Sequence, residues 1–138
     1  MTESRGSPAG GATILVVERD PHVRVLETFF LNEAGYAVEF SDDGAAALER
    51  ARRLRPALLI TEILVPKLDG LALCRLLKAD PETRGIRVLI FSILTASARA
   101  RDAGADAFLR KPLAEQKLVE TVRRLLAGPG DASPGESA

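Results

Sequence analysis

Residues 13–21, TILVVERDP, decide the fold, because they predict a buried strand that leads directly into a helix. The run TILVV (13–17) is aliphatic and rich in β-branched residues, as expected for a strand covered on both faces of a sheet. Asp20 suits the N-cap of a helix, and Pro21 suits its first position. Four apolar residues then recur at helical spacing: Val23, Leu26, Phe30 and Ala34. A strand followed by such a helix is the repeating unit of a parallel sheet.

The same alternation continues along the chain. Short apolar runs predict four more strands, at residues 37–40, 57–61, 87–92 and 107–110. Helical patterns separate and follow them, at residues 41–54, 71–78, around 96–102, and in a last segment with Leu118, Val122, Leu125 and Leu126. Five strands alternating with five helices predict a flavodoxin-like, doubly wound α/β fold. Its parallel sheet would have the order 2-1-3-4-5, with helices on both faces.

Composition predicts one domain with a polar tail at each end. Residues 1–11 and 128–138 are rich in Gly, Pro and Ser, and they contain too little apolar surface to offset the entropy of ordering. We expect both segments to be disordered and residues 12–127 to form the domain.

Charge and cysteine content exclude several classes of function. The chain of 138 residues has 19 Lys+Arg and 19 Asp+Glu, so no basic field favours nucleic acid or an anionic membrane. Cys74 is the only cysteine, which excludes an internal disulfide and a multi-cysteine zinc site. No segment has the pattern of a signal peptide or a membrane span, so we expect a cytoplasmic location.

Polar side chains follow the ends of four predicted strands. Ligand sites in such sheets lie outside the carboxyl ends of the strands, so these groups should share one rim. They are Glu18, Arg19 and Asp20 after the first strand, Glu62 after the third, Ser92 after the fourth, and Arg110 and Lys111 after the fifth. The sequence therefore predicts a site where carboxylates, a hydroxyl and cations converge.

Three segments resemble the receiver domains of bacterial response regulators: ILVVERDPHVRVLETFFLNEAGY, PALLITEILVPKLDGLALCRLLKAD and AGADAFLRKP. The resemblance covers roughly residues 12–127. It implies a domain in which an aspartate after the third strand accepts a phosphoryl group from a histidine kinase. Acidic residues after the first strand help to bind Mg²⁺, and a Thr or Ser and a Lys contact the phosphoryl oxygens.

Carried over residue by residue, the resemblance assigns each rim position a role. Glu62 stands at the phosphoacceptor position, and Glu18, Arg19 and Asp20 stand in the acidic pocket. The hydroxyl position is Ser92, the lysine is Lys111, and the aromatic switch position is Phe108. The peptide before Pro112 matches one that is cis in the family.

Several positions depart from the family pattern. Glutamate at 62 places its carboxylate ~1.5 Å further from the backbone than aspartate would, and a displacement of about 1 Å can cost about 10²-fold in rate. Arg19 replaces an acidic residue, which removes an oxygen ligand of the kind that Mg²⁺ requires. Ile93 is large where the family prefers a small residue, and the segment from Ser92 to Lys111 is short. We therefore expect weak or absent Mg²⁺ binding, no metal ligands and no catalytic residues.

Two interpretations of the pocket remain open. Either Arg19 or Lys111 forms an ion pair with Glu62 and favours an active-like state without phosphate, or the pocket is degenerate and the domain has one fixed docking conformation. The short segment after Ser92, and Phe108 in place of a polar aromatic residue, favour the fixed docking conformation. Simpler roles also remain: Asp20 and Asp69 as helix caps, and Glu18 and Glu62 as solvated carboxylates.

We predict an atypical receiver that signals through phosphorylation-independent protein–protein contacts and is not an enzyme. The partner would be a signalling protein, such as a histidine kinase or an effector, bound at the fourth helix, fifth strand and fifth helix. A homodimer stays open, and no direct binding to nucleic acid or membrane is expected. The alternatives are a receiver phosphorylated at a non-standard acceptor and a small flavodoxin-like ligand-binding protein.

Overall fold

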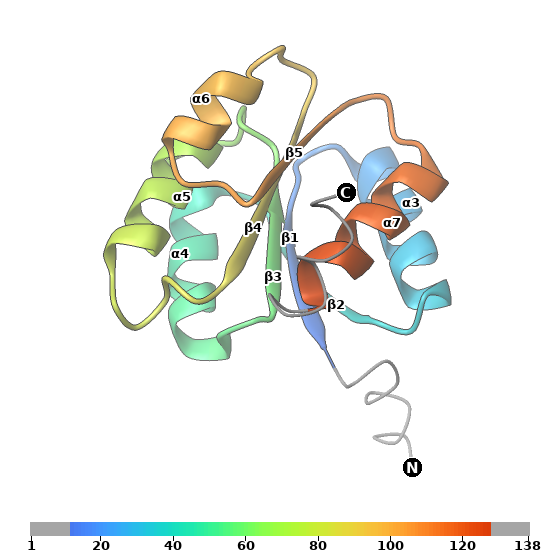
Figure 1. The fold of residues 1–138 in the computed structure, drawn as a ribbon, viewed down its shortest axis with the longest axis horizontal. Helices are drawn as coiled ribbons and strands as arrows, with labels where there is room; N and C mark the ends of the chain where they lie inside the picture. Colours follow the sequence, from blue (N-terminus) through green and yellow to red (C-terminus); the bar gives the residue numbers. More distant parts are fainter. Residues whose placement is uncertain (1–11, 128–138) are drawn as a thin grey trace, which may run out of the picture.

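The computed structural model describes residues 12–127. Both predicted tails, residues 1–11 and 128–138, lie outside the described residues. Five strands alternate with five helices in the described part of the chain (Figure 1). The strands are β1 (Thr13–Val17), β2 (Ala37–Ser41), β3 (Leu58–Thr61), β4 (Arg87–Ser92) and β5 (Ala107–Arg110). The helices are α3 (Pro21–Glu33), α4 (Gly44–Leu54), α5 (Gly70–Ala79), α6 (Ser97–Asp102) and α7 (Glu115–Leu126).

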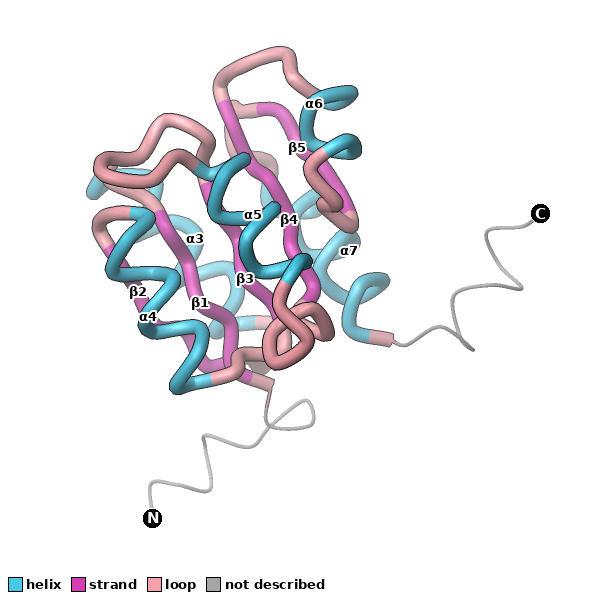
Figure 2. Tube along the Cα trace, turned by 90° about the vertical axis from the view of Figure 1, so that its left-hand side faces the viewer, coloured by secondary structure: helices cyan, strands magenta, loops and turns pink. Residues whose placement is uncertain are grey.

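The strands form one parallel sheet in the order β2-β1-β3-β4-β5. Helices α4, α5 and α6 cover one face, and α3 and α7 cover the other (Figures 1 and 2). The predicted fold class and strand order are confirmed. Because all strands point the same way, the residues that follow β1, β3, β4 and β5 meet at one edge of the sheet.

Side chains of the central strands alternate between two apolar layers. Leu15 and Val17 of β1 belong to the layer under α4, α5 and α6. Ile14 and Val16 belong to the layer under α3 and α7. This period of two is what a strand buried on both faces requires.

Aspartates cap three of the helices at this edge. Asp20 accepts a hydrogen bond from the backbone N–H of His22 at 2.9 Å, and Asp69 accepts one from the N–H of Ala72 at 2.9 Å. Asp43 caps α4 in the same way. These contacts satisfy backbone donors that the helices leave free, and they confirm the cap roles of Asp20 and Asp69.

The buried face of α3 differs from the predicted stripe. Leu26 is 45% exposed, while Glu27 is only 1% exposed. Residues 23, 27 and 31 recur every four positions and so lie on one side of the helix, whereas residue 26 is turned by about 100° from it. The prediction that Leu26 packs into the core was wrong, and an acidic residue takes its place.

Two glycines fix the loop between β3 and α5 in position. A Cβ atom added at Gly70 would lie 2.3 Å from the carbonyl oxygen of Glu62, and one added at Gly44 would lie 1.7 Å from that of Leu68. The starts of α4 and α5 therefore pack directly on the backbone of this loop.

Two further features concern helix length. Helix α6 has 6 residues, as expected from the short segment that contains it. Between residues 12 and 127, no helix combines the length and the apolar character needed to cross a membrane.

Candidate functional site

The edge formed by the carboxyl ends of the strands brings four predicted residues together. Glu18 follows β1, Glu62 follows β3, Ser92 ends β4, and Lys111 follows β5. Glu18, Glu62 and Ser92 are 2%, 4% and 0% exposed, so their polar groups must find partners within the protein. The alternative in which Glu18 and Glu62 are solvated carboxylates is wrong.

Glu62 is the most densely hydrogen-bonded side chain of this site. Its Oε1 accepts from the Ser92 hydroxyl and from the backbone N–H of Ile63 at 2.6 Å. Its Oε2 accepts from the backbone N–H of Ile93 at 3.2 Å and lies 3.1 Å from Lys111 Nζ. Donors from β4, from the loop after β3 and from the segment after β5 therefore converge on one carboxylate.

Lys111 joins the two buried glutamates. Its Nζ lies 2.9 Å from Glu18 Oε1 and 3.1 Å from Glu62 Oε2. Glu18 Oε2 in turn accepts from the backbone N–H of Asp20 at 3.1 Å. One ammonium group thus balances part of the charge of two carboxylates.

Arg19 does not take part in this network. Its side chain is exposed, and none of the ion pairs between residues 12 and 127 involves it. Of the two cations considered for pairing with Glu62, Lys111 makes the contact and Arg19 does not. Of the two neighbouring residues after β1, Glu18 is buried against Lys111, whereas Arg19 is exposed to solvent.

These contacts shift the pKa values of both partners. Burial alone would raise the pKa of Glu62, but hydrogen bonds from Ser92, Lys111 and Ile63 and the charge of Lys111 hold it below its usual value. Burial alone would lower the pKa of Lys111, but Glu18 and Glu62 raise it above its usual value. Both groups are therefore charged at neutral pH.

The remaining predicted residues surround the network without joining it. Asp20 is exposed and caps α3. Phe108 is half-buried on β5 and packs against the layer under α6. The peptide between Lys111 and Pro112 is cis. The Ile93 side chain is 57% exposed, although its backbone N–H contacts Glu62.

Glu27, a residue near the network, was not predicted from the sequence as a site residue. Glu27 of α3 is buried, and its Oε1 has no hydrogen-bond partner among the described residues. Burial, with a smaller contribution from Glu18, raises the pKa of Glu27 to about 8. The available signal was its spacing of four residues from both Val23 and Leu31, which places it on the apolar face of the helix.

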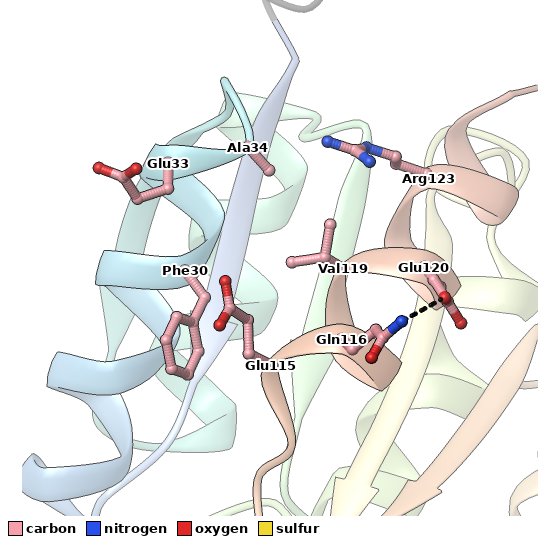
Figure 3. Close-up of a pocket in the computed structure, with 8 residues that line it drawn as sticks. All are labelled: Phe30, Glu33, Ala34, Glu115, Gln116, Val119, Glu120 and Arg123. Carbon is pink, nitrogen blue, oxygen red and sulfur yellow. Dashed lines mark hydrogen bonds between the residues drawn. The ribbon is translucent and has the colours of Figure 1, made fainter.

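The network is the only cluster of buried charges near these strand ends within the described residues, and a separate groove lies elsewhere on the surface. A groove of about 570 Å³ lies between α3 and α7 (Figure 3). It is lined by the apolar side chains of Phe30, Ala34 and Val119 and by the charged side chains of Glu33, Glu115, Glu120 and Arg123. Gln116 donates to Glu120 at 3.4 Å along α7 in this groove. No residue of the Glu62 network lines it.

Comparison with known proteins identifies the family. The family model of the response regulator receiver domain matches residues 14–123. The chain belongs to this family. The resemblance seen in the sequence is thus confirmed at the level of the family.

Relatives place this receiver in two-component signalling. It is 38% identical to the response regulator MprA of Mycobacterium leprae over 123 residues, which cover 87% of this chain and 54% of that protein. The chain thus spans about half the length of the curated relatives it matches. It is also 34% identical to the transcriptional regulator RpaA of Synechocystis, over 82% of this chain and 48% of that protein.

Solved receiver structures share the fold. The receiver domain of a histidine kinase from Syntrophus aciditrophicus is 38% identical and superposes with a TM-score of 0.79, over 85% of this chain and 91% of that one. The receiver domain of the sensor histidine kinase PA1611 from Pseudomonas aeruginosa, solved with a magnesium ion in its active-site cleft, is 25% identical with a TM-score of 0.78. That match covers 85% of this chain and 98% of the other.

Proposed function

We propose that this receiver transmits signals through protein–protein contacts that do not depend on its phosphorylation. The observation that carries the proposal is the set of donors around Glu62: the Ser92 hydroxyl, the Ile93 N–H and the Lys111 ammonium. By the family resemblance, the hydroxyl at the position of Ser92 and the lysine at the position of Lys111 contact the phosphoryl oxygens. Here the carboxylate of Glu62 already accepts hydrogen bonds from Ser92 and Ile93 and pairs with Lys111.

The same contacts oppose the use of Glu62 as an acceptor. A carboxylate that attacks a phosphodonor needs a free oxygen lone pair directed outward, and both oxygens of Glu62 accept hydrogen bonds inside the protein. Its exposure of only 4% also keeps a donor molecule away.

The donor set fits a divalent cation poorly. Mg²⁺ prefers several oxygen ligands in octahedral geometry, and the ammonium of Lys111 lies against both remaining carboxylates, those of Glu18 and Glu62. The third position of the cluster is Arg19, whose side chain is exposed. Within residues 12–127, no three His, Cys, Asp or Glu side chains are grouped as a metal site. We therefore propose weak or absent Mg²⁺ binding.

Of the two interpretations of the pocket, the ordered network favours the active-like one. A degenerate pocket would leave buried polar groups unpaired, at a cost of about 1–3 kcal/mol each. Glu18, Glu62 and Ser92 are instead each hydrogen-bonded. Lys111 supplies the positive charge that a metal ion would otherwise bring.

We place the partner surface on α6, β5 and α7. Strand β5 is at the edge of the sheet, and the short helix α6 leaves a hollow of about 450 Å³ beside it, lined by Arg101 and Phe108 among others. A second hollow of about 350 Å³ lies between β5 and α7, and Phe108 lines it as well. An aromatic residue between two hollows suits an anchor at a protein interface.

Phosphodonor labelling tests the proposal. The receiver would be incubated with acetyl phosphate and Mg²⁺ and then analysed by intact mass spectrometry. We expect no added phosphoryl group, and no change in amide NMR shifts with fluoroberyllate and Mg²⁺. Stoichiometric, Mg²⁺-dependent labelling at Glu62 would overturn the proposal and favour a receiver with a non-standard acceptor.

The double variant Arg19→Asp, Glu62→Asp is the matched control. It restores the family's acidic residues on the same scaffold, so labelling of this variant shows that the assay detects a working pocket. The partner surface has its own test, a photo-crosslinking amino acid at Arg101 compared with one at Arg52, an exposed residue of α4. Partner adducts from position 52 rather than 101 would contradict the assigned surface.

A further inference from the structure

Glu27 is a buried carboxyl group on the face of α3 that also carries Val23 and Leu31. It is 1% exposed, and its Oε1 has no hydrogen-bond partner among the described residues. Leu31, one turn further along the same face of α3, packs in the layer that contains Val16 and Leu118. Nothing in the pocket contacts described above uses Glu27, so its burial calls for another explanation.

The environment of Glu27 favours its neutral form. A carboxylate buried without a partner loses several kcal/mol of hydration, and this desolvation is the main reason that the pKa of Glu27 is raised to about 8. The negative charge of Glu18 raises it further, the ammonium of Lys111 lowers it, and Glu62 raises it slightly. The three charges that act on Glu27 are thus the three charges of the Glu62 network.

We propose that Glu27 is an internal proton-binding site that controls how Lys111 is shared between Glu18 and Glu62. With the proton bound, Lys111 faces two carboxylates and contacts both. When the proton leaves to solvent, three carboxylates compete for one ammonium. The attraction between Lys111 and Glu62 is then weakened, and with it the arrangement around Ile93, whose N–H donates to Glu62.

Other charged groups near α3 are too exposed to replace these three. Glu115, Glu120 and Arg123 of α7, which packs on α3, are exposed around the groove of Figure 3. Glu39 of β2 is paired with Arg50 at the surface. Water and salt screen such groups, whereas the buried network is screened much less. The coupling therefore runs between Glu27 and the pocket.

This inference goes beyond the proposed function. It concerns the proton on Glu27 and its effect on the network, and it holds whether or not Glu62 accepts a phosphoryl group. It gives the domain a response to pH above neutrality that phosphorylation chemistry does not supply.

NMR titration of side-chain carboxyl carbons tests the coupling directly. In the full chain, the Glu27 carboxyl carbon should titrate with a midpoint of about 8, and the amide signals of Ile63 and Ile93 should shift with the same midpoint. Titration of Glu27 near its ordinary value of 4.5, or amide signals that do not follow it, would overturn the proposal.

Substitutions at Glu18 and Lys111 show whether each group raises or lowers the titration midpoint of Glu27. Glu18→Gln removes a repulsion and should lower the Glu27 midpoint, whereas Lys111→Met removes an attraction and should raise it. Shifts in the opposite sense, or none, contradict the assigned coupling.

The controls separate this effect from general changes in the fold. Glu27→Gln keeps the size of the side chain and should abolish the shared transition at the Ile63 and Ile93 amides. Glu33→Gln, on the exposed side of α3, should leave the transition intact. A transition that persists in Glu27→Gln assigns the titration to another group and refutes the inference.

Discussion

Lys111 Nζ lies 3.1 Å from Glu62 Oε2, and only 16% and 5% of the two side chains are exposed. The same ammonium lies 2.9 Å from Glu18 Oε1. A buried cation that is paired with two anions is costly to leave unpaired. Lys111, Glu18 and Glu62 should therefore each matter for stability as well as for signalling.

Replacing Glu62 by Gln should destabilise the domain. The substitution keeps the side-chain length but removes the charge that pairs with Lys111. Loss of one partner of a buried pair costs about 3–5 kcal/mol; because Lys111 keeps Glu18, we expect about 1–3 kcal/mol at neutral pH. Urea unfolding measures the difference, with exposed Glu33→Gln as the control. Equal stability of Glu62→Gln and wild type would mean that the pair contributes nothing.

Replacing Ser92 by Ala should raise the pKa of Glu62 toward its ordinary value. The Ser92 hydrogen bond is the strongest of the effects that lower this pKa, and Leu94 N–H also loses its acceptor on Ser92 Oγ. The Glu62 carboxyl carbon, followed by NMR against pH, gives the value directly. Ser97→Ala, at an exposed position, should leave it unchanged; an unchanged value in Ser92→Ala would argue against this hydrogen bond.

Replacing Glu27 by Gln should change how stability depends on pH. The folded-state pKa of Glu27 is raised from 4.5 to about 8, so unfolding releases a proton and wild-type stability falls as pH rises through that window. Glu27→Gln lacks this decline and should gain on wild type by at most about 5 kcal/mol above the window. Unfolding curves at several pH values give the difference, and parallel curves for the two proteins would rule out a shifted Glu27.

Acid should act on Glu62 in the opposite direction. Its folded-state pKa is lowered, so its contribution to stability is present above the ordinary value of 4.5 and is lost as pH falls through the folded-state value. Glu62→Gln should therefore lose less stability on acidification than wild type. Thermal melts below about pH 5 test this, and a steeper acid loss in the variant would contradict it.

Replacing Gly70 by Ala should destabilise the loop after β3. The new methyl group would lie 2.3 Å from the backbone oxygen of Glu62, and overpacking of this kind costs about 1–3 kcal/mol. Gly85→Ala is the matched control, because a Cβ there meets nothing within 4 Å. If both alanine variants unfold at the same urea concentration, the close contact at Gly70 is not tight.

Much of the fold followed from local patterns in the sequence. The run TILVV and the Asp20-Pro21 pair predicted a strand and a capped helix, and both form. These features are decided by alternation, caps and proline geometry, which act over a few residues. Leu26 was misplaced because several apolar residues in α3 offered two competing faces.

The sequence predicted which strand-end residues lie at the site, but only part of the contacts between them. The strand-end rule placed Glu18, Glu62, Ser92 and Lys111 on one rim, since that follows from topology alone. The choice between Arg19 and Lys111 depended on whether the Arg19 side chain is buried with Glu18 or exposed, and it is exposed. Glu27 lay outside this rule, because it belongs to the face of a helix and not to the end of a strand.

The glycine contacts at the two ends of the β3–α5 loop separate the course of its backbone from the chemistry of residue 62. With Gly44 against Leu68 and Gly70 against Glu62, the loop backbone is anchored independently of the side chain at position 62. The course of the loop backbone is therefore set separately from the side-chain contacts that Glu62 contributes to stability. We therefore expect Glu62→Gln to lower the stability of the domain while the loop backbone keeps its course between the two glycines.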